Sequence, residues 1–163
     1  MAFRLSEPAA TAIAERLVAD LPAAITARNA EITDGFTLAA PGEVYPFVPS
    51  AKRLSVVGYE AIGIGRLKTE FQDDIGVVVT GTHDLPILAY LADPDAEALA
   101  VRVERMLQVV TGVVMRDRDL PIDNFEGMGL RRIDYGPTWD AEEDPRLVRS
   151  FGVLTVWVRT EDS

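Results

Sequence analysis

The fold is best predicted from residues 73–116, which read DDIGVVVTGTHDLPILAYLADPDAEALAVRVERMLQVVTGVVMR. Ile75–Thr82 contains three consecutive valines and predicts a central strand, because a strand that is apolar on both faces must be covered on both. The apolar residues 85–91, LPILAYL, are expected to link this strand to a helix that begins at Asp93-Pro94. The stretch therefore predicts a helix packed on a sheet.

The helix predicted over residues 93–116 has the features of a core helix. Asp93 is placed to cap it, and the acidic residues of its first turns and Arg116 at its end match the helix dipole. Its apolar residues recur at intervals of three or four, which predicts one buried face. The residues expected to pack on the sheet are Leu99, Val103, Met106, Leu107 and Val110.

A second helix is predicted at the N-terminus, over residues 6–29. Ser6 is a suitable N-cap, and Pro8 fits the first turn because its missing N–H would have no partner there. Pro22 removes one backbone hydrogen bond from the middle of this helix. We therefore expect the helix to be broken near Pro22, either by a kink or by a new start.

The C-terminal region predicts two further strands. Met128–Tyr135 alternates with a slip at Arg131-Arg132, which indicates a β-bulge. Leu147–Arg159 is apolar on both faces, and the acidic segment 136–145 is expected to form the turn between them.

These elements predict a single α+β domain over residues 1–163. Its mixed, largely antiparallel sheet is expected to have about four to five strands, with the long helix 93–116 and the N-terminal helix packed on it. Two arrangements remain open for the doubly apolar last strand. Either one helix covers each face of the sheet, or both helices lie on one face and a partner subunit covers the other.

Composition limits the classes of function. The net charge of −10 disfavours gripping nucleic acid, because an acidic surface repels phosphate. The chain has no cysteine, which excludes disulfides and thiolate metal sites and fits folding in a reducing cytoplasm. We expect a soluble protein, since neither a secretory signal nor a membrane-spanning run is recognisable.

No group of residues predicts catalysis. His83 is the only histidine and is expected to lie in a loop, with Asp73 about 30 Å away at the far end of the same strand, as about 3.3 Å per residue implies. The carboxylates within 140–144 are expected to lie in a solvated turn, whereas a carboxylate pair for acid–base catalysis needs burial or a fixed spacing. The glycines at 58, 63 and 65 lack the pattern of a phosphate-binding loop. We therefore expect no enzyme, no cofactor and no metal.

The segment Gly58–Asp74 combines glycine with apolar and basic residues and lacks regular alternation. We expect it to be a mobile loop that becomes ordered at an interface with another subunit or a partner protein, and the alternative is a simple exposed β-hairpin. Its candidate contact residues, together with one residue of the last strand, are Tyr59, Arg66, Lys68, Phe71 and Trp157.

Three segments, in this order along the chain, resemble the tail terminator (tail completion) proteins of long-tailed bacteriophages: VVVTGTHD (77–84), LAVRVERMLQVV (99–110) and SFGVLTVWVRTED (150–162). The resemblance implies a virion protein without catalytic residues that forms a homo-oligomeric ring, typically a hexamer. Such a ring caps the head-proximal end of the tail, stops polymerisation of the major tail tube protein and docks the head connector or stopper protein. DNA passes through its lumen without specific binding, and assembly takes place in the host cytoplasm.

Two other interpretations remain open. One is another head–tail joining protein, such as a connector or stopper. The other is a small cytoplasmic enzyme or ligand-binding domain with a pocket between the long helix and the sheet.

Overall fold

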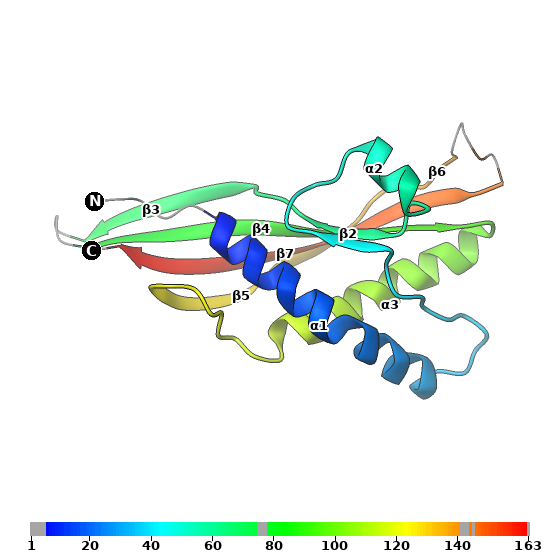
Figure 1. Ribbon diagram of the computed structural model, residues 1–163, viewed down its shortest axis with the longest axis horizontal. Helices are drawn as coiled ribbons and strands as arrows, with labels where there is room; N and C mark the ends of the chain where they lie inside the picture. The colour runs from blue at the N-terminus through cyan, green and yellow to red at the C-terminus, as the bar shows by residue number, and fades with distance from the viewer. Residues whose placement is uncertain (1–5, 75–77, 141–143, 145, 163) are drawn as a thin grey trace.

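The computed structural model describes residues 6–74, 78–140, 144 and 146–162, and these form the predicted α+β fold (Figure 1). The helices of this part of the chain are α1 (Glu7–Glu31), α2 (Ala51–Val56) and α3 (Ala96–Met115). Its strands form one mixed, largely antiparallel sheet and are β1 (Glu43–Tyr45), β2 (Ala61–Ile64), β3 (Lys68–Asp74), β4 (Val78–Asp93), β5 (Phe125–Tyr135), β6 (Trp139–Asp140) and β7 (Val148–Asp162).

The described sheet has seven strands, more than the four or five that were expected. The path through it is β1-β2-β4-β7-β5, while β3 pairs with β4 and β6 pairs with β7. β1 and β6 have three and two residues, so they are too short to show an alternating pattern.

The centre of the sheet is the antiparallel pair of β4 and β7, in which Val79–Asp93 lies opposite Val148–Asp162 without interruption. The prediction that residues 85–91 form a link is therefore wrong, because they continue β4. Leu85, Ile87, Ala89 and Leu91 alternate toward the core and are buried. The predicted strand start at Ile75 lies outside the described residues.

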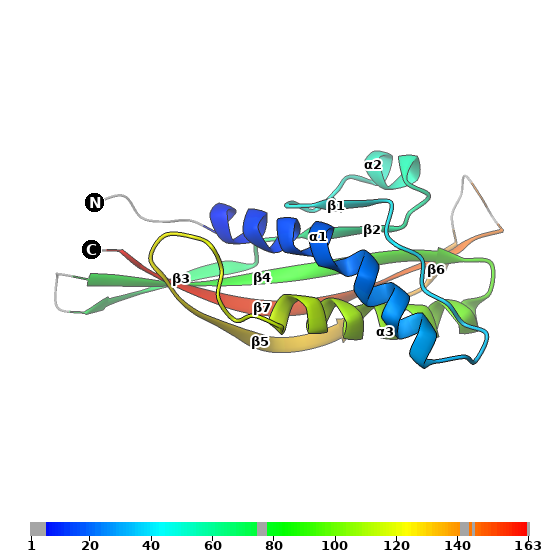
Figure 2. The same cartoon turned by 60° about the horizontal axis from the view of Figure 1, so that its bottom comes forward.

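Both long helices lie on the same face of the sheet (Figure 2). The side chains that join them in one core come from alternate positions, Ile62 and Ile64 on β2, Leu85 to Leu91 on β4, and Leu154 to Val158 on β7. A Cβ at Gly152 would meet Val103 and Leu107 of α3, which places α3 directly on β7. The alternative of one long helix on each face is therefore wrong.

α1 continues through Pro22 as one helix, so the new helix start that was one of the two predicted outcomes is not found. Its axis changes direction about halfway along (Figure 2), which is the other predicted outcome, a kink of the kind that an internal proline commonly causes. The packing of Leu17 and Leu21 before the proline and Ile25 after it outweighs the lost bond, because all three side chains are buried. Ser6 precedes the helix, but its side chain makes no capping hydrogen bond.

α3 begins later than was predicted. Asp95, and not Asp93, is its N-cap, and its carboxylate accepts a hydrogen bond of 2.9 Å from the Glu97 amide. Asp93 is the last residue of β4 and accepts from the Asp95 amide at 2.8 Å. The predicted core residues of this helix are confirmed, since all five are buried: Leu99, Val103, Met106, Leu107 and Val110.

The prediction of one mobile loop over Gly58–Asp74 is wrong for the described chain. The segment contains β2 and β3, and β3 forms the hairpin arm with β4 that was the alternative. The glycines and charged residues of this segment obscured the alternating pattern of the two strands. The helix α2, which precedes the segment, was not predicted either. β3, β4 and β7 extend beyond the N-terminal end of α1, and we call this projecting end of the sheet the arm (Figure 1).

The two C-terminal strands are confirmed, with small shifts of their ends. β5 has the predicted irregularity at Arg131 and a second one at Glu126. β7 starts one residue later than was predicted and continues to Asp162. Residues 141–143 and 145 of the predicted acidic turn lie outside the described residues.

The opposite face of the sheet is covered only in part. A Cβ at Gly63 would meet Pro49 and the Phe47 carbonyl, so the segment that leads into α2 lies on this face. The Arg149 guanidinium, also on this face, stacks 3.0 Å from the centre of the Tyr59 ring. We call the face opposite α1 and α3 the open face.

Candidate interaction surface

The β5 end of the sheet is exposed along its whole second half. All six residues from Leu130 to Tyr135 are exposed, although β5 pairs with β7 over this length. Leu130, Ile133 and Tyr135 lie opposite Val156, Leu154 and Gly152, so they project on the side of the sheet that carries the helices. They are 46%, 42% and 62% exposed, respectively. An edge strand with this much exposed apolar surface is typical of an interface.

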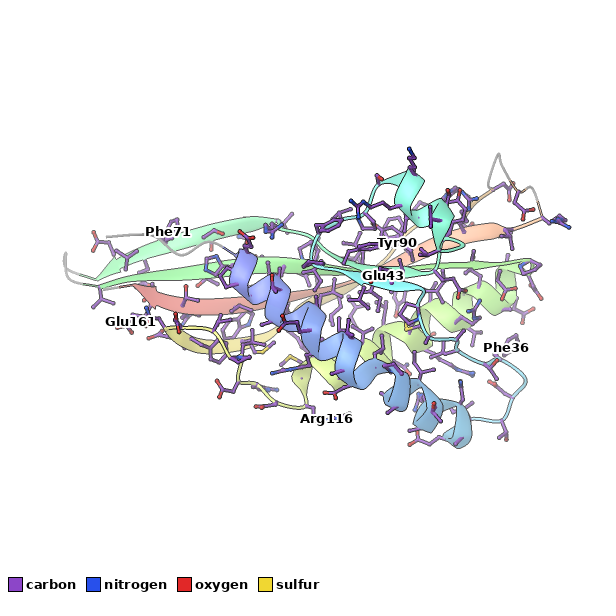
Figure 3. The ribbon with its side chains drawn as sticks, viewed as in Figure 1. Phe36, Glu43, Phe71, Tyr90, Arg116 and Glu161 are labelled. Atoms are coloured by element: carbon purple, nitrogen blue, oxygen red, sulfur yellow. The ribbon has the colours of Figure 1, made fainter. Side chains whose placement is uncertain are left out.

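The other end of the sheet path is β1, and it borders an apolar groove of about 170 Å³. The groove lies between α1 and residues 40–44, and Leu17, Leu21, Pro22 and Val44 are among its lining residues. Val18 stands on its wall and is 59% exposed. Glu43 at the start of β1 is also exposed (Figure 3). This end therefore offers an apolar hollow beside an acidic side chain.

The arm carries two of the residues that were predicted to make contacts. Phe71 is 49% exposed at the middle of β3, partway along the arm (Figure 3). Lys68 at its base bonds Glu70 at 2.8 Å and lies 3.9 Å from Asp84. The ammonium group of Lys68 lowers the pKa of the Glu70 carboxyl. The arm thus presents an aromatic side chain on one face and a pair of opposite charges on the other.

The open face has a row of residues that crosses four strands. Lys68, Asp84, Trp157 and Gly129 are successive partners in the sheet register. The Trp157 ring lies over Gly129, where a Cβ would approach its Nε1 to 2.7 Å. Asp84 is buried in this row, and Arg131 bonds it at 3.1 Å. The half-buried Trp157 is therefore held flat against the sheet.

The structure brings together only some of the predicted contact residues. Lys68 and Trp157 share the row on the open face, and Phe71 lies on the same arm but projects on the other side. Arg66 is exposed between β2 and β3, in a hollow with the N-terminal end of α1. Tyr59 lies apart from them, packed on Arg149 with a left-handed backbone φ of 62°.

His83 is not in a loop, as was expected, but in the middle of β4. It is fully buried, and its ring nitrogens lie 3.0 Å from the Thr69 hydroxyl and 3.2 Å from the Thr160 hydroxyl. Asp73 is on the neighbouring strand β3 and not at the far end of the same strand. Across the described residues, no cluster of three or more histidine, aspartate or glutamate side chains is placed to hold a metal ion.

A groove of about 460 Å³ runs between α1 and α3, lined by Ala24, Arg28, Val109 and Val113 among others. It lies between the two helices and not between α3 and the sheet, where a ligand pocket was the alternative expectation. At the α3–sheet contact, Leu107 fills the space above Gly152. Neither α1 nor α3 combines the length and the low charge that a membrane-spanning helix requires.

Sequence reasoning did not identify the exposed apolar surfaces at the two ends of the sheet. The slip at Arg131-Arg132 was recognisable, but the exposure of Leu130, Ile133 and Tyr135 depends on β5 being the outermost strand. That order is set by pairing between distant segments, which alternation within one strand does not report.

The comparisons with known proteins agree with this fold. No protein-family model matches the chain, and no curated protein sequence matches it. A chain in the solved structure described as "Virion of native gene transfer agent (GTA) particle" superposes with a TM-score of 0.53. The match covers 94% of each chain at 15% sequence identity. The protein shares its fold with that virion chain.

Proposed function

We propose that this protein is a structural component of a phage-like virion. The observation that carries the proposal is the fold shared with a chain of a gene transfer agent particle, over 94% of both chains. A further feature supports it. The sheet ends in exposed apolar surface, which suits an assembly subunit.

Within the virion, the role we propose is that of a tail terminator. Copies of the chain form a ring, six-fold in the simplest case, that caps the tail tube at the head-proximal end of the tail. The ring stops addition of the major tail tube protein and provides the docking surface for the head connector or stopper protein. The net charge of −10 suits a channel through which DNA passes without being held.

The candidate contacts with the neighbouring subunit or the tube lie on the arm and the open face: Tyr59, Arg66, Lys68, Phe71 and Trp157. Lys68 and Phe71 carry this assignment best, because the projecting arm reaches beyond the helices (Figure 3).

The deciding experiment deletes the gene from the genome that encodes it and examines the particles by electron microscopy. Tails of irregular length without attached heads are expected, with rescue by the wild-type gene. Mass spectrometry of wild-type particles should detect the protein. Normal particles from the deletion strain, or particles that lack the protein, would contradict the proposed role.

A second test targets the arm with a folded triple variant, Arg66→Glu, Lys68→Glu and Phe71→Ala. Loss of length control with retained folding is the expected result. Tails of normal length would exclude the arm as the tube contact, while the virion role would stand.

A further inference from the structure

We propose that neighbouring copies join through the two ends of the sheet, with β5 of one copy docking beside β1 of the next. This inference rests on the proposed function, because it names the contact that would build the ring. The surfaces involved are the exposed half of β5 (Leu130–Tyr135) and the groove between α1 and β1.

The strand directions allow this contact. Along the path from β2 to β5 each strand is antiparallel to the one before it, and β1 is parallel to β2. A neighbouring sheet in the same orientation would therefore bring its β5 antiparallel to β1. The sheet would continue from copy to copy, and the edge hydrogen-bonding groups of both strands would find partners.

The apolar side chains match in side and in size. Leu130, Ile133 and Tyr135 project on the helix side of β5, and the groove beside β1 also lies on the helix side, because α1 forms its wall. Val44 is the partner of the core residue Ile62 and so faces the same way. A hollow of about 170 Å³ accepts one branched apolar side chain, and Ile133 stands at the middle of the exposed strand.

The charges match as well. Arg131 and Arg132 follow one another at the bulge of β5, and the β1 end presents the exposed Glu43. Arg132 already bonds Asp134 at 2.7 Å, but its side chain is 69% exposed. It can therefore reach a neighbouring copy without giving up a buried contact. Opposite charges at the rim of an apolar contact favour one orientation over others.

The contact uses two different surfaces of the same chain, so it is heterologous. Such contacts close into a ring when the rotation between copies fits and otherwise extend into a filament. A contact of β5 with β5 would instead be isologous and would stop at a two-fold dimer.

Two single variants separate these cases. Ile133→Glu disables β5 and leaves the groove intact, and Val18→Glu disables the groove and leaves β5 intact. Both residues are largely exposed in the monomer, so the fold is expected to survive, which thermal unfolding checks. Val56→Glu is the matched control, because Val56 is an 82% exposed apolar residue on α2 that lies neither on β5 nor in the groove lining.

The assemblies are measured by native mass spectrometry at the highest concentration that each protein tolerates. Wild type and Val56→Glu should give rings, and each of the two disabled variants alone should stay at the monomer mass of 17.8 kDa. An equal mixture of the two disabled variants should give a 1:1 heterodimer and nothing larger, because only one intact contact remains. Glu43→Arg and Arg132→Glu should each weaken the ring, and combining both in one chain should restore it.

Several outcomes would overturn the inference. They are a monomeric wild type, rings from either disabled variant, or dimers from Val18→Glu alone, which would indicate β5 pairing with itself. None of these results bears on whether the protein is part of the virion, because the deletion experiment tests that separately.

Discussion

Arg105 on α3 binds both carboxylate oxygens of Asp34, in the segment that leads from α1 to β1. The same guanidinium donates to the Phe36 carbonyl at 2.7 Å. The pair fastens this connection to the helix layer.

This pair should make stability depend on pH. The hydrogen bond from Arg105 lowers the pKa of Asp34 from 3.8 to about 2. A carboxyl with a lowered pKa in the folded state contributes stability above pH 3.8, and that contribution is lost as the pH falls toward 2. Asp34→Asn should therefore unfold more easily than wild type at neutral pH, and the difference should shrink across this window. Urea unfolding at a series of pH values measures it, and a constant difference would show that the pair does not act.

The contact between Leu107 and Gly152 should make two substitutions non-additive. Leu107→Ala removes a buried side chain and should cost about 2–5 kcal/mol of unfolding free energy. Gly152→Ala places a methyl group against Leu107 and Val103 and should cost about 1–3 kcal/mol in the wild-type background. In the Leu107→Ala background the second cost should fall, because the space is vacant. Chemical denaturation of the four proteins measures the coupling, and simple addition of the two costs would argue against this packing.

His83→Ala should destabilise the fold, because it leaves the hydroxyls of Thr69 and Thr160 without the imidazole inside the sheet. The expected loss is about 1–3 kcal/mol, the usual consequence of removing one partner from a buried polar contact. Metal content before and after the change, measured by mass spectrometry, should be the same. A bound metal that disappears with His83 would assign this residue a different role.

Gly129→Ala should displace the Trp157 ring, since its Cβ would lie within 2.8 Å of three ring atoms. We expect a loss of about 1–3 kcal/mol and a red-shifted tryptophan emission, read in a Trp139→Phe background. Gly112→Ala is the matched control, because a Cβ at that helical position meets nothing within 4 Å. That control should gain about 0.8–1 kcal/mol from helix propensity. Equal effects at the two glycines would refute the close contact at Trp157.

Much of the fold was predictable because it rests on local periodicity. The apolar stripe from Leu99 to Val110 identified the face of α3, and the valines of β4 identified a central strand. Residues 85–91 were misassigned because Pro86 and the approaching Asp93-Pro94 suggest a connection. Only the pairing with Ser150–Val156 shows that the strand continues.

The candidate site was less predictable, for a physical reason. Whether Ile133 is buried or exposed depends on which strands flank β5, and whether Val18 borders a groove depends on where residues 40–44 pass. Both are set by contacts between distant segments. Phe71 was singled out as a contact candidate and is exposed, but its place on a paired strand follows from the register with Gly81.

The long pairing of β4 with β7 affects how this protein folds during its synthesis. During synthesis, β4 and the apolar stripe of α3 leave the ribosome well before Val148–Asp162, the segment that pairs with β4 at the centre of the sheet. Closing so long a loop is slow relative to forming the helices. The nascent chain therefore carries uncovered valine-rich surface until Val148–Asp162 has been made. A truncation near residue 147 should leave a chain that chaperones hold and proteases remove, and not a smaller folded protein.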